Sequence, residues 1–370
     1  MMIPNGPLDR PQAPMTVSAA RPRRLVFAGE AIVDVVLRVP GLPPRGGDLL
    51  ATSAEVAVGG GFNVMAAAAR QGLPVLYAGG HGTGHWGDLV RAALAAEGIG
   101  LLRPPDPSGD TGFDVALVEP DAERTFVTAL GAESVGEPGG WDAVPAGLGD
   151  VVYVSGYGLV APGSGPGLAA WAAALPAGAL LFVDPGPLVA QIPAQMLEPV
   201  LARCDWLSCN AREAALLTGV TAHEAVGRLL ARAARANVLV RLGPDGCLLA
   251  TRPPTADARP TTDAPPTADA PPTTGARPTT GAPPTTGAAS APSVPRPPVP
   301  DAPVHIPAPA VHAVDTTGAG DAHAGVFLAA LADGLSPADA ARRANAAAAL
   351  AVTRPGPATS PTRAELDAWN

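Results

Sequence analysis

The sequence contains no lysine, and all 24 of its Lys/Arg positions are arginine. A Walker-A phosphate loop requires a lysine, and so does a protein kinase. Schiff-base and pyridoxal-phosphate enzymes require one as well. These four classes are therefore excluded for this chain acting alone.

Cysteine, positive charge and long apolar runs are also scarce. Cys204, Cys209 and Cys247 form neither a CxxC pair nor a zinc spacing, so we expect reduced structural thiols. The formal net charge of -9 does not suit a nucleic-acid binder. Residues 1–24 lack the apolar segment of a signal peptide, and no later run reaches the roughly 20 apolar residues of a membrane span. We therefore expect a soluble, cytoplasmic protein with no nucleic-acid or membrane partner.

Aromatic residues make up only 4% of the chain, whereas hydrophobic residues make up 47%. The core must therefore be built from Ala, Val and Leu. Short apolar runs alternate with Ala-rich segments of helical length along most of the chain. This alternation predicts an α/β fold in which a parallel sheet is covered by helices on both faces.

Two segments depart from this pattern. Residues 1–24 are rich in Pro and Arg, and residues 253–302 repeat Pro, Thr, Ala and Gly units with almost no large apolar side chain. Such segments bury too little surface to offset the entropy of ordering them. We expect a disordered tail, a disordered insertion, and one domain formed by residues 25–252 and 303–370.

The most informative motif is Asp315-Thr316-Thr317-Gly318-Ala319-Gly320-Asp321, a Gly-rich turn that runs into an apolar helix. The amides of Gly318, Ala319 and Gly320 would point outward at the positive end of the helix, where anions bind well. Asp321 could accept the proton of an attacking hydroxyl group, although an aspartate here could also serve only as a helix cap. The pattern therefore predicts phosphoryl transfer, with Asp321 as the base and the three amides as an anion hole.

This motif resembles the C-terminal signature of the ribokinase-like (PfkB-type) carbohydrate kinases. Gly59-Gly60-Gly61-Phe62-Asn63, followed by an Ala-rich helix, resembles the N-terminal signature of the same family. The order and separation of the two motifs also fit. The resemblance implies a three-layer α/β/α Rossmann-like ribokinase fold with a small β lid, which we place at residues 40–57 and 112–130.

The resemblance also implies roles for individual residues. It implies that ATP and Mg²⁺ are the cofactors and that K⁺ is a possible third. The expected sugar-binding residues are Asp34, Gly60, Gly61 and Asn63, with helix capping as the other interpretation of Asn63. The expected nucleotide and magnesium residues are Asn210, Glu213, Arg241, Gly243 and Gly246, although Asn210 and Glu213 would look the same as a simple capping box. The expected monovalent-cation ligands are Asp315, Thr317, Ala351, Gly356 and Ser360.

Several alternatives stay open at the level of sequence. The acceptor could be a sugar or a nucleoside, and the chain could be a sugar-binding sensor without activity. Residues 82–87 fit GxGxxG, which raises a weaker dinucleotide-binding interpretation. Exposed lid strands could also form a homodimer.

Overall fold

The computed structural model describes residues 21–121, 123–136, 140–252 and 302–369. The predicted tail lies almost entirely outside the described residues, and so does nearly all of the predicted insertion. The first strand, β1, begins at Arg24, one residue before the predicted domain boundary. The backbone amide of Arg23 donates to the Gly149 carbonyl at 2.6 Å, so Arg23 and Arg24, which the prediction assigned to the tail, belong to the folded domain.

Within the described residues, nine strands form one sheet in the order β13-β12-β11-β10-β9-β8-β1-β4-β5. The pairings from β11 to β5 are parallel, whereas β12 and β13 add an antiparallel edge. Parallel neighbours require crossover connections, and the helices supply them. The strands are β1 (Arg24–Ala28), β4 (Val75–Tyr77), β5 (Gly100–Leu101), β8 (Asp150–Ser155), β9 (Leu180–Asp184), β10 (Trp206–Asn210), β11 (Asn237–Arg241), β12 (Cys247–Ala250) and β13 (Val304–Ile306).

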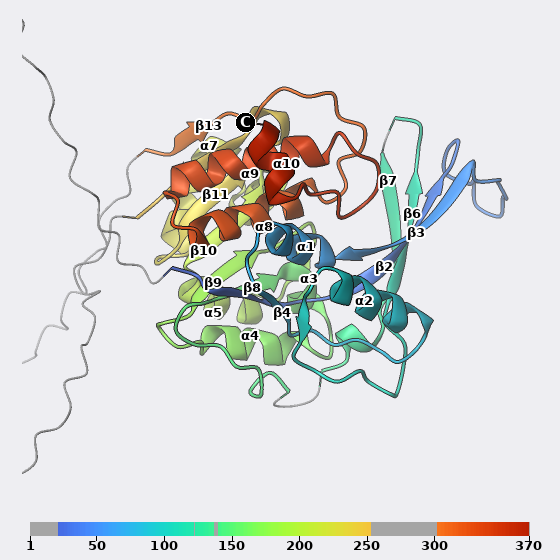
Figure 1. Ribbon diagram of the computed structural model, residues 1–370, viewed down its shortest axis with the longest axis horizontal. Coiled ribbons are helices and arrows are strands. Elements are labelled where there is room, and N and C mark those ends of the chain that lie inside the picture. The colour runs from blue at the N-terminus through green and yellow to red at the C-terminus, as the bar shows by residue number, and fades with distance from the viewer. Residues whose placement is uncertain (1–20, 122, 137–139, 253–301, 370) are drawn as a thin grey trace, which may run out of the picture. The chain divides into compact units, whose positions relative to one another are not determined.

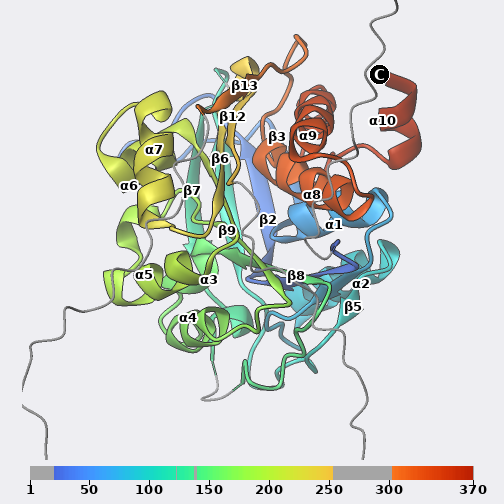
Figure 2. The ribbon, with the colours of Figure 1, turned by 90° about the vertical axis from the view of Figure 1, so that its left-hand side faces the viewer.

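Helices cover both faces of this sheet, as Figure 2 shows edge-on. One face carries α3 (Gly156–Val160), α4 (Gly165–Ala173), α5 (Ala194–Arg203), α6 (Ala211–Thr218) and α7 (Ala222–Arg232). The other carries α1 (Phe62–Arg70), α2 (His85–Ala96), α8 (Ala319–Ala332) and α9 (Pro337–Ala351), with α10 (Arg363–Trp369) packed outside them. Short 3₁₀ turns lie at Ala132–Ser134, Val189–Gln191 and Gly243–Asp245.

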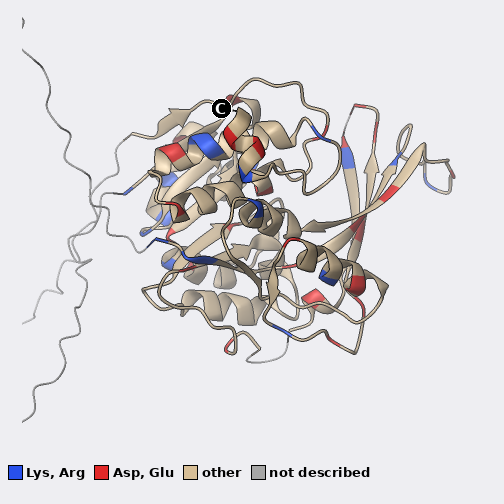
Figure 3. Cartoon of the chain, in the orientation of Figure 1, with Lys and Arg blue, Asp and Glu red and all other residues tan. Residues whose placement is uncertain are grey.

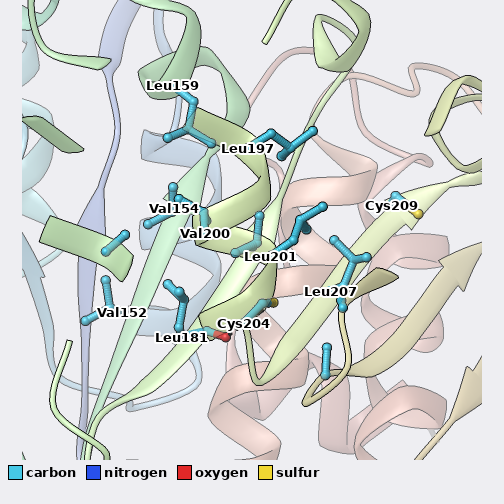
Figure 4. Close-up of a cluster of buried hydrophobic side chains, with 14 of the residues drawn as sticks. Val152, Val154, Leu159, Leu181, Leu197, Val200, Leu201, Cys204, Leu207 and Cys209 are labelled. Carbon is cyan, nitrogen blue, oxygen red and sulfur yellow. Dashed lines mark hydrogen bonds between the residues drawn. The ribbon is translucent and has the colours of Figure 1, made fainter. Parts of the chain in front are cut away.

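Successive side chains along each strand point to opposite faces of the sheet and pack into two separate cores. Val152 and Val154 of β8 pack with the helices of the first face, whereas Val151 and Tyr153 pack with those of the second. Figure 4 shows part of the first core, in which Val, Leu and Cys side chains interdigitate without an aromatic ring among those drawn. Each buried Val or Leu contributes roughly 1.5–3 kcal/mol of transfer free energy, so many small side chains replace a few large ones.

A second sheet of four strands projects from the first and forms the lid (Figure 1). Its order is β3 (Ser53–Gly60), β2 (Ala31–Arg38), β6 (Phe113–Val118) and β7 (Arg124–Ala129). The predicted lid omitted residues 31–38, although β2 lies at its centre, antiparallel to β3 and parallel to β6. The omission has a physical cause: β2 follows β1 after only Gly29 and Glu30, so the sequence alone does not show that the chain changes sheets there.

Charge and hydropathy are distributed without a dominant face. Figure 3 shows acidic and basic positions interspersed over helices and strands rather than gathered by sign. Among the described helices, none is long and apolar enough to cross a membrane. The described part of the chain also contains no group of three or more His, Cys, Asp or Glu side chains arranged to hold a metal ion.

Candidate functional site

The Gly-rich turn forms the amino end of α8. Gly318 is the N-cap residue, with a left-handed φ of 72° that glycine adopts without steric cost. The helix begins at Ala319. The amide of Ala319 donates to the Thr316 carbonyl at 3.3 Å, and the remaining first-turn amides lack intrahelical acceptors, as at any helix start. This end of α8 can therefore bind an anion.

Asp321 lies in the first turn of α8 and is held from the other end of the chain. Its Oδ2 accepts a hydrogen bond of 3.1 Å from Nδ2 of Asn63. The N-cap of α1 is Gly61, so Asn63 does not cap its helix, and the capping interpretation of Asn63 was wrong. Burial raises the pKa of Asp321 to about 6, with a further increase from Asp184, while the Asn63 hydrogen bond and Arg241 oppose the shift. A carboxylate with this pKa can act as a base near neutral pH.

Arg241 places a cation beside the same helix end. Its Nη1 contacts Asp184 Oδ2 at 2.7 Å and also donates to the Ser208 hydroxyl, and its Nη2 lies 3.6 Å from Glu213 Oε2. A methyl group at Gly320 would lie 3.5 Å from Nε and Nη2. The guanidinium group is thus fixed by two carboxylates and faces the amide end of α8.

Asn210 and Glu213 form a complete capping box at the start of α6. The backbone amide of Asn210 and its side-chain Nδ2 donate to the Glu213 carboxylate at 2.7 and 2.8 Å. The backbone amide of Glu213 donates to Asn210 Oδ1 at 2.9 Å. Glu213 is buried and also faces Arg241. Both of its oxygens already accept protein donors, so these residues help to position Arg241, and a magnesium ion could contact them through water.

The predicted sugar-binding residues lie where the lid meets the core. Asp34 is buried on β2, and burial raises its pKa to about 8, with Asp114 and then Asp321 raising it further. Gly60 has a positive φ of 59°, and a methyl group at Gly61 would lie 2.1 Å from the Phe27 ring. Glycine at these positions lets β3 turn directly into α1 and brings Asn63 to Asp321.

The structure adds acidic residues that sequence reasoning missed. Asp114 on β6 is the register partner of Asp34, and burial raises its pKa to about 6. Burial raises the pKa of Glu30 to about 8, opposed by a hydrogen bond that the Ser155 hydroxyl donates at 3.2 Å. Asp184 ends β9 against Arg241. Their position within strands or in the link between two strands gave only a weak signal, because no motif surrounds them.

The predicted monovalent-cation residues are only partly brought together. The Asp315 carboxylate accepts hydrogen bonds from Thr317 and from the Gly356 amide at 3.1 Å, and the Ser360 hydroxyl is buried without a hydrogen-bond partner. The unpartnered hydroxyl fits a cation ligand. The carbonyls of Ala351 and Ser360, however, already accept donors from Thr359 and Arg70.

Two lid arginines also occupy the surroundings of Asp315. Arg124 lies 3.5 Å from the carboxylate and donates to the hydroxyls of Thr316 and Thr317, and Arg38 lies 3.9 Å from Asp315. Burial opposes ionisation of Asp315, but the hydrogen bonds from Thr317 and Gly356, and then the charge of Arg124, lower its pKa overall. The charge of Asp315 is therefore balanced by the protein itself.

The remaining glycine motifs are explained by local geometry. Gly243 and Gly246 both have positive φ, at 62° and 91°, in the turn between β11 and β12, and a methyl group at Gly246 would collide with the Ile306 carbonyl. In the GxGxxG segment, the amides of Trp86 and Gly87 donate to the Asp110 carboxylate at 3.0 and 2.8 Å. That carboxylate takes the place a pyrophosphate would need, which argues against the dinucleotide interpretation.

Comparison with known proteins agrees with this arrangement. The pfkB family of carbohydrate kinases matches residues 22–276 and 297–364. The uncharacterized sugar kinase YegV of Escherichia coli strain K12 is 30% identical over 347 residues, which cover 92% of each chain. The chain therefore belongs to the pfkB carbohydrate kinase family.

Solved structures show the same fold. The ribokinase of Thermotoga maritima superposes with a TM-score of 0.68 at 22% identity, covering 94% of this chain and 98% of that one. The Arabidopsis thaliana ribokinase complexed with ribose and ATP gives 0.64 at 21% identity, with coverage of 94% and 98%. The predicted α/β ribokinase-like fold is confirmed.

Proposed function

We propose that this chain transfers the terminal phosphoryl group of ATP to a hydroxyl group of a small sugar. The observation that carries the proposal is the juxtaposition of Asp321, hydrogen-bonded to Asn63, with the amino end of α8. Membership of the pfkB family supports the reaction class. One complex within the same fold, that of the Arabidopsis ribokinase, contains ribose and ATP.

In the proposed reaction, Asp321 takes the proton of the acceptor hydroxyl group. The oxygen of that hydroxyl group bonds to the γ-phosphorus of ATP. The bond from that phosphorus to the bridging oxygen breaks, and ADP leaves. The amides of Gly318, Ala319 and Gly320 stabilise the charge on the transferring oxygens. Arg241 adds a permanent cation at the same place, which we propose as the role of this predicted nucleotide residue.

Magnesium would accompany the nucleotide and neutralise its phosphates. Asn210 and Glu213 would act on it through water, while Gly243 and Gly246 shape the adjoining turn. Asp34, Gly60, Gly61 and Asn63 would hold the acceptor under the lid. The predicted monovalent-cation site consists of Asp315, Thr317, Ala351, Gly356 and Ser360. Because Arg124 already balances the negative charge of Asp315, we expect K⁺ to change the activity only slightly.

The test is ATP consumption against a panel of sugars, sugar phosphates and nucleosides, with Mg²⁺ and with or without K⁺. We expect one acceptor to stimulate turnover and Asp321→Asn to reduce it by about 10²–10⁴-fold, the usual loss for an acid–base residue. A nucleoside that outperforms every sugar would establish the alternative acceptor. Folded protein that binds sugar without acceptor-dependent turnover would instead indicate a sensor, and the proposed function would fail.

A homodimer through the lid is a further part of the proposal. Val56, Phe126, Val127 and Leu130 are exposed apolar side chains on or beside the lid strands. Burying these side chains against a second copy would be favourable. Sedimentation that detects only monomer at micromolar concentration would contradict the proposed dimer.

We also propose a cytoplasmic location, as expected for an ATP-dependent enzyme. Cell fractionation tests this location.

A further inference from the structure

The acceptor side of the site is lined by carboxylates on adjacent strands. Asp34 of β2 and Asp114 of β6 are direct register partners in a parallel pair, and both are buried. A methyl group at Gly59 of β3 would lie 2.1 Å from Asp34 Oδ2, so the third strand closes tightly over this carboxylate. The lid therefore presents two acidic side chains together, where the sequence motifs indicated one.

The core contributes further acidic side chains to the same region. Asp321 and Glu30 belong to it, and Asp321 raises the pKa of both Asp34 and Glu30. Burial raises the pKa of the Tyr157 phenol, and Glu30, Asp321 and Asp114 raise it further. These residues thus surround one region between the lid and the start of α8.

The unsatisfied polar atoms of this region are hydrogen-bond acceptors. Oδ1 of Asp114 and Oδ1 of Asn63 are buried and have no hydrogen-bond partner, and Asn63 is fixed in the cluster by its bond to Asp321. Buried polar atoms without a partner are costly, so a bound molecule is the natural source of their donors. A hydroxyl or ammonium group can supply a donor, whereas a phosphate dianion or carboxylate cannot.

The nearby cations are already paired with acids. Arg241 is held by Asp184 and faces Glu213. Arg124 and Arg38 both face Asp315. An acidic group placed against Asp34 and Asp114 would therefore meet other acidic side chains rather than a guanidinium group.

We propose that the acceptor is a polyhydroxy compound without an acid group, recognised jointly by Asp34 and Asp114, and that sugar acids and sugar phosphates are rejected. This inference rests on the proposed kinase function and deepens it. Asp114 is then a specificity-determining residue, because its free oxygen accepts a donor from the acceptor. An amine in place of one hydroxyl group is compatible with the same site.

The experiment uses the full chain and acceptor sets that share a free primary hydroxyl and differ in charge. One set is glucose, glucosamine and gluconate, and another is fructose and fructose 6-phosphate, with pentoses and nucleosides added in neutral form. Phosphoryl transfer is measured by the product and binding by calorimetry. We expect turnover and binding with neutral or amino members only, and preference for any acid or phosphate member overturns the inference while leaving the kinase function intact.

A chain that turns over no member fails the proposed function, and the binding measurements then decide the inference alone. Tighter binding of an anionic member, or binding of no member at millimolar concentration, overturns it.

The variant Asp114→Asn tests the assigned residue with its shape preserved. We expect the KM of the preferred acceptor to rise about tenfold or more, with kcat changed less than about threefold, because a charged hydrogen-bond acceptor is lost away from the reacting atoms. The ligand-free variant should also melt at a higher temperature, since an unpartnered buried carboxylate beside Asp34 is removed. Asp121→Asn, the same change at an exposed position of the lid hairpin, is the control and should alter neither quantity. An unchanged KM in Asp114→Asn contradicts the assignment.

Discussion

At the scale of single residues, Asp321 is defined by its surroundings more than by its own chemistry. An aspartate at the start of an exposed helix would have a pKa near 4. Here burial raises the pKa to about 6, and Asp184 contributes in the same direction. The residue can therefore be ionised at neutral pH and still accept a proton readily.

This shift predicts an acidic limb in the pH profile. Because Asp321 must be ionised to act as a base, kcat/KM should fall about tenfold per pH unit below a midpoint near pH 6. Steady-state rates between pH 4.5 and 8, in protein shown by circular dichroism to stay folded, provide the measurement. A midpoint near pH 4 would indicate that the base is not buried as described.

Arg241 gives a second prediction at the residue scale. A lysine would keep the charge but could not contact Asp184 and Glu213 while facing the start of α8, because it lacks the guanidinium fork. Arg241→Lys should lower kcat by about tenfold or more and leave the KM of the acceptor nearly unchanged.

The matched control is Arg235→Lys, which alters a half-exposed arginine paired with Asp205 at 3.0 Å. It should leave kcat unchanged. Full turnover in Arg241→Lys would show that the cation takes no part in the reaction.

At the scale of elements, the start of α8 depends on a backbone conformation. Gly318 has φ of 72° as N-cap of α8, and Gly219 has φ of 73° as C-cap of α6. Alanine at either position should cost roughly 1–2 kcal/mol of stability, because a Cβ atom is strained in the left-handed region.

Only Gly318→Ala should also reduce turnover. A methyl group at Gly318 would lie 3.5 Å from the Asn63 side-chain amide, whereas a methyl group at Gly219 would have no neighbouring atom within 4 Å. Melting temperatures and kcat of the two variants separate the effects. Equal turnover in both would show that the Gly318 turn has no role beyond folding.

Helix α5 forms where the local sequence does not indicate a helix. Pro193 precedes it and Pro199 lies inside it, so the segment has the punctuation of a loop. Leu197, Val200 and Leu201 nevertheless bury one face against the sheet. Tertiary burial here outweighs a local signal that opposes the helix.

At the scale of the whole molecule, the described residues close around the ends of the predicted insertion. Leu249 of β12 is the register partner of Val304 of β13, so the two strands form an antiparallel hairpin. The two matched family segments omit residues 277–296, which lie within it.

We therefore expect that replacing residues 253–301 with a short linker of about four residues leaves the melting temperature and kcat nearly unchanged. Thermal unfolding and steady-state rates, compared with the full chain, provide the test. Preserved stability with lost turnover would instead assign the segment a role in binding the nucleotide.

The sequence by itself determined the class of fold and the Gly-rich start of α8, because those depend on local patterns: alternating apolar runs, and glycines followed by aspartate at a helix start. It also indicated Asn63, although only the structure showed its bond to Asp321. Tertiary structure alone decided that β2 joins the lid, that Asp114 stands opposite Asp34, and that Arg241 faces α8 between Asp184 and Glu213. Those contacts join residues far apart in the chain, and sheet register and burial, which no short motif encodes, bring them together.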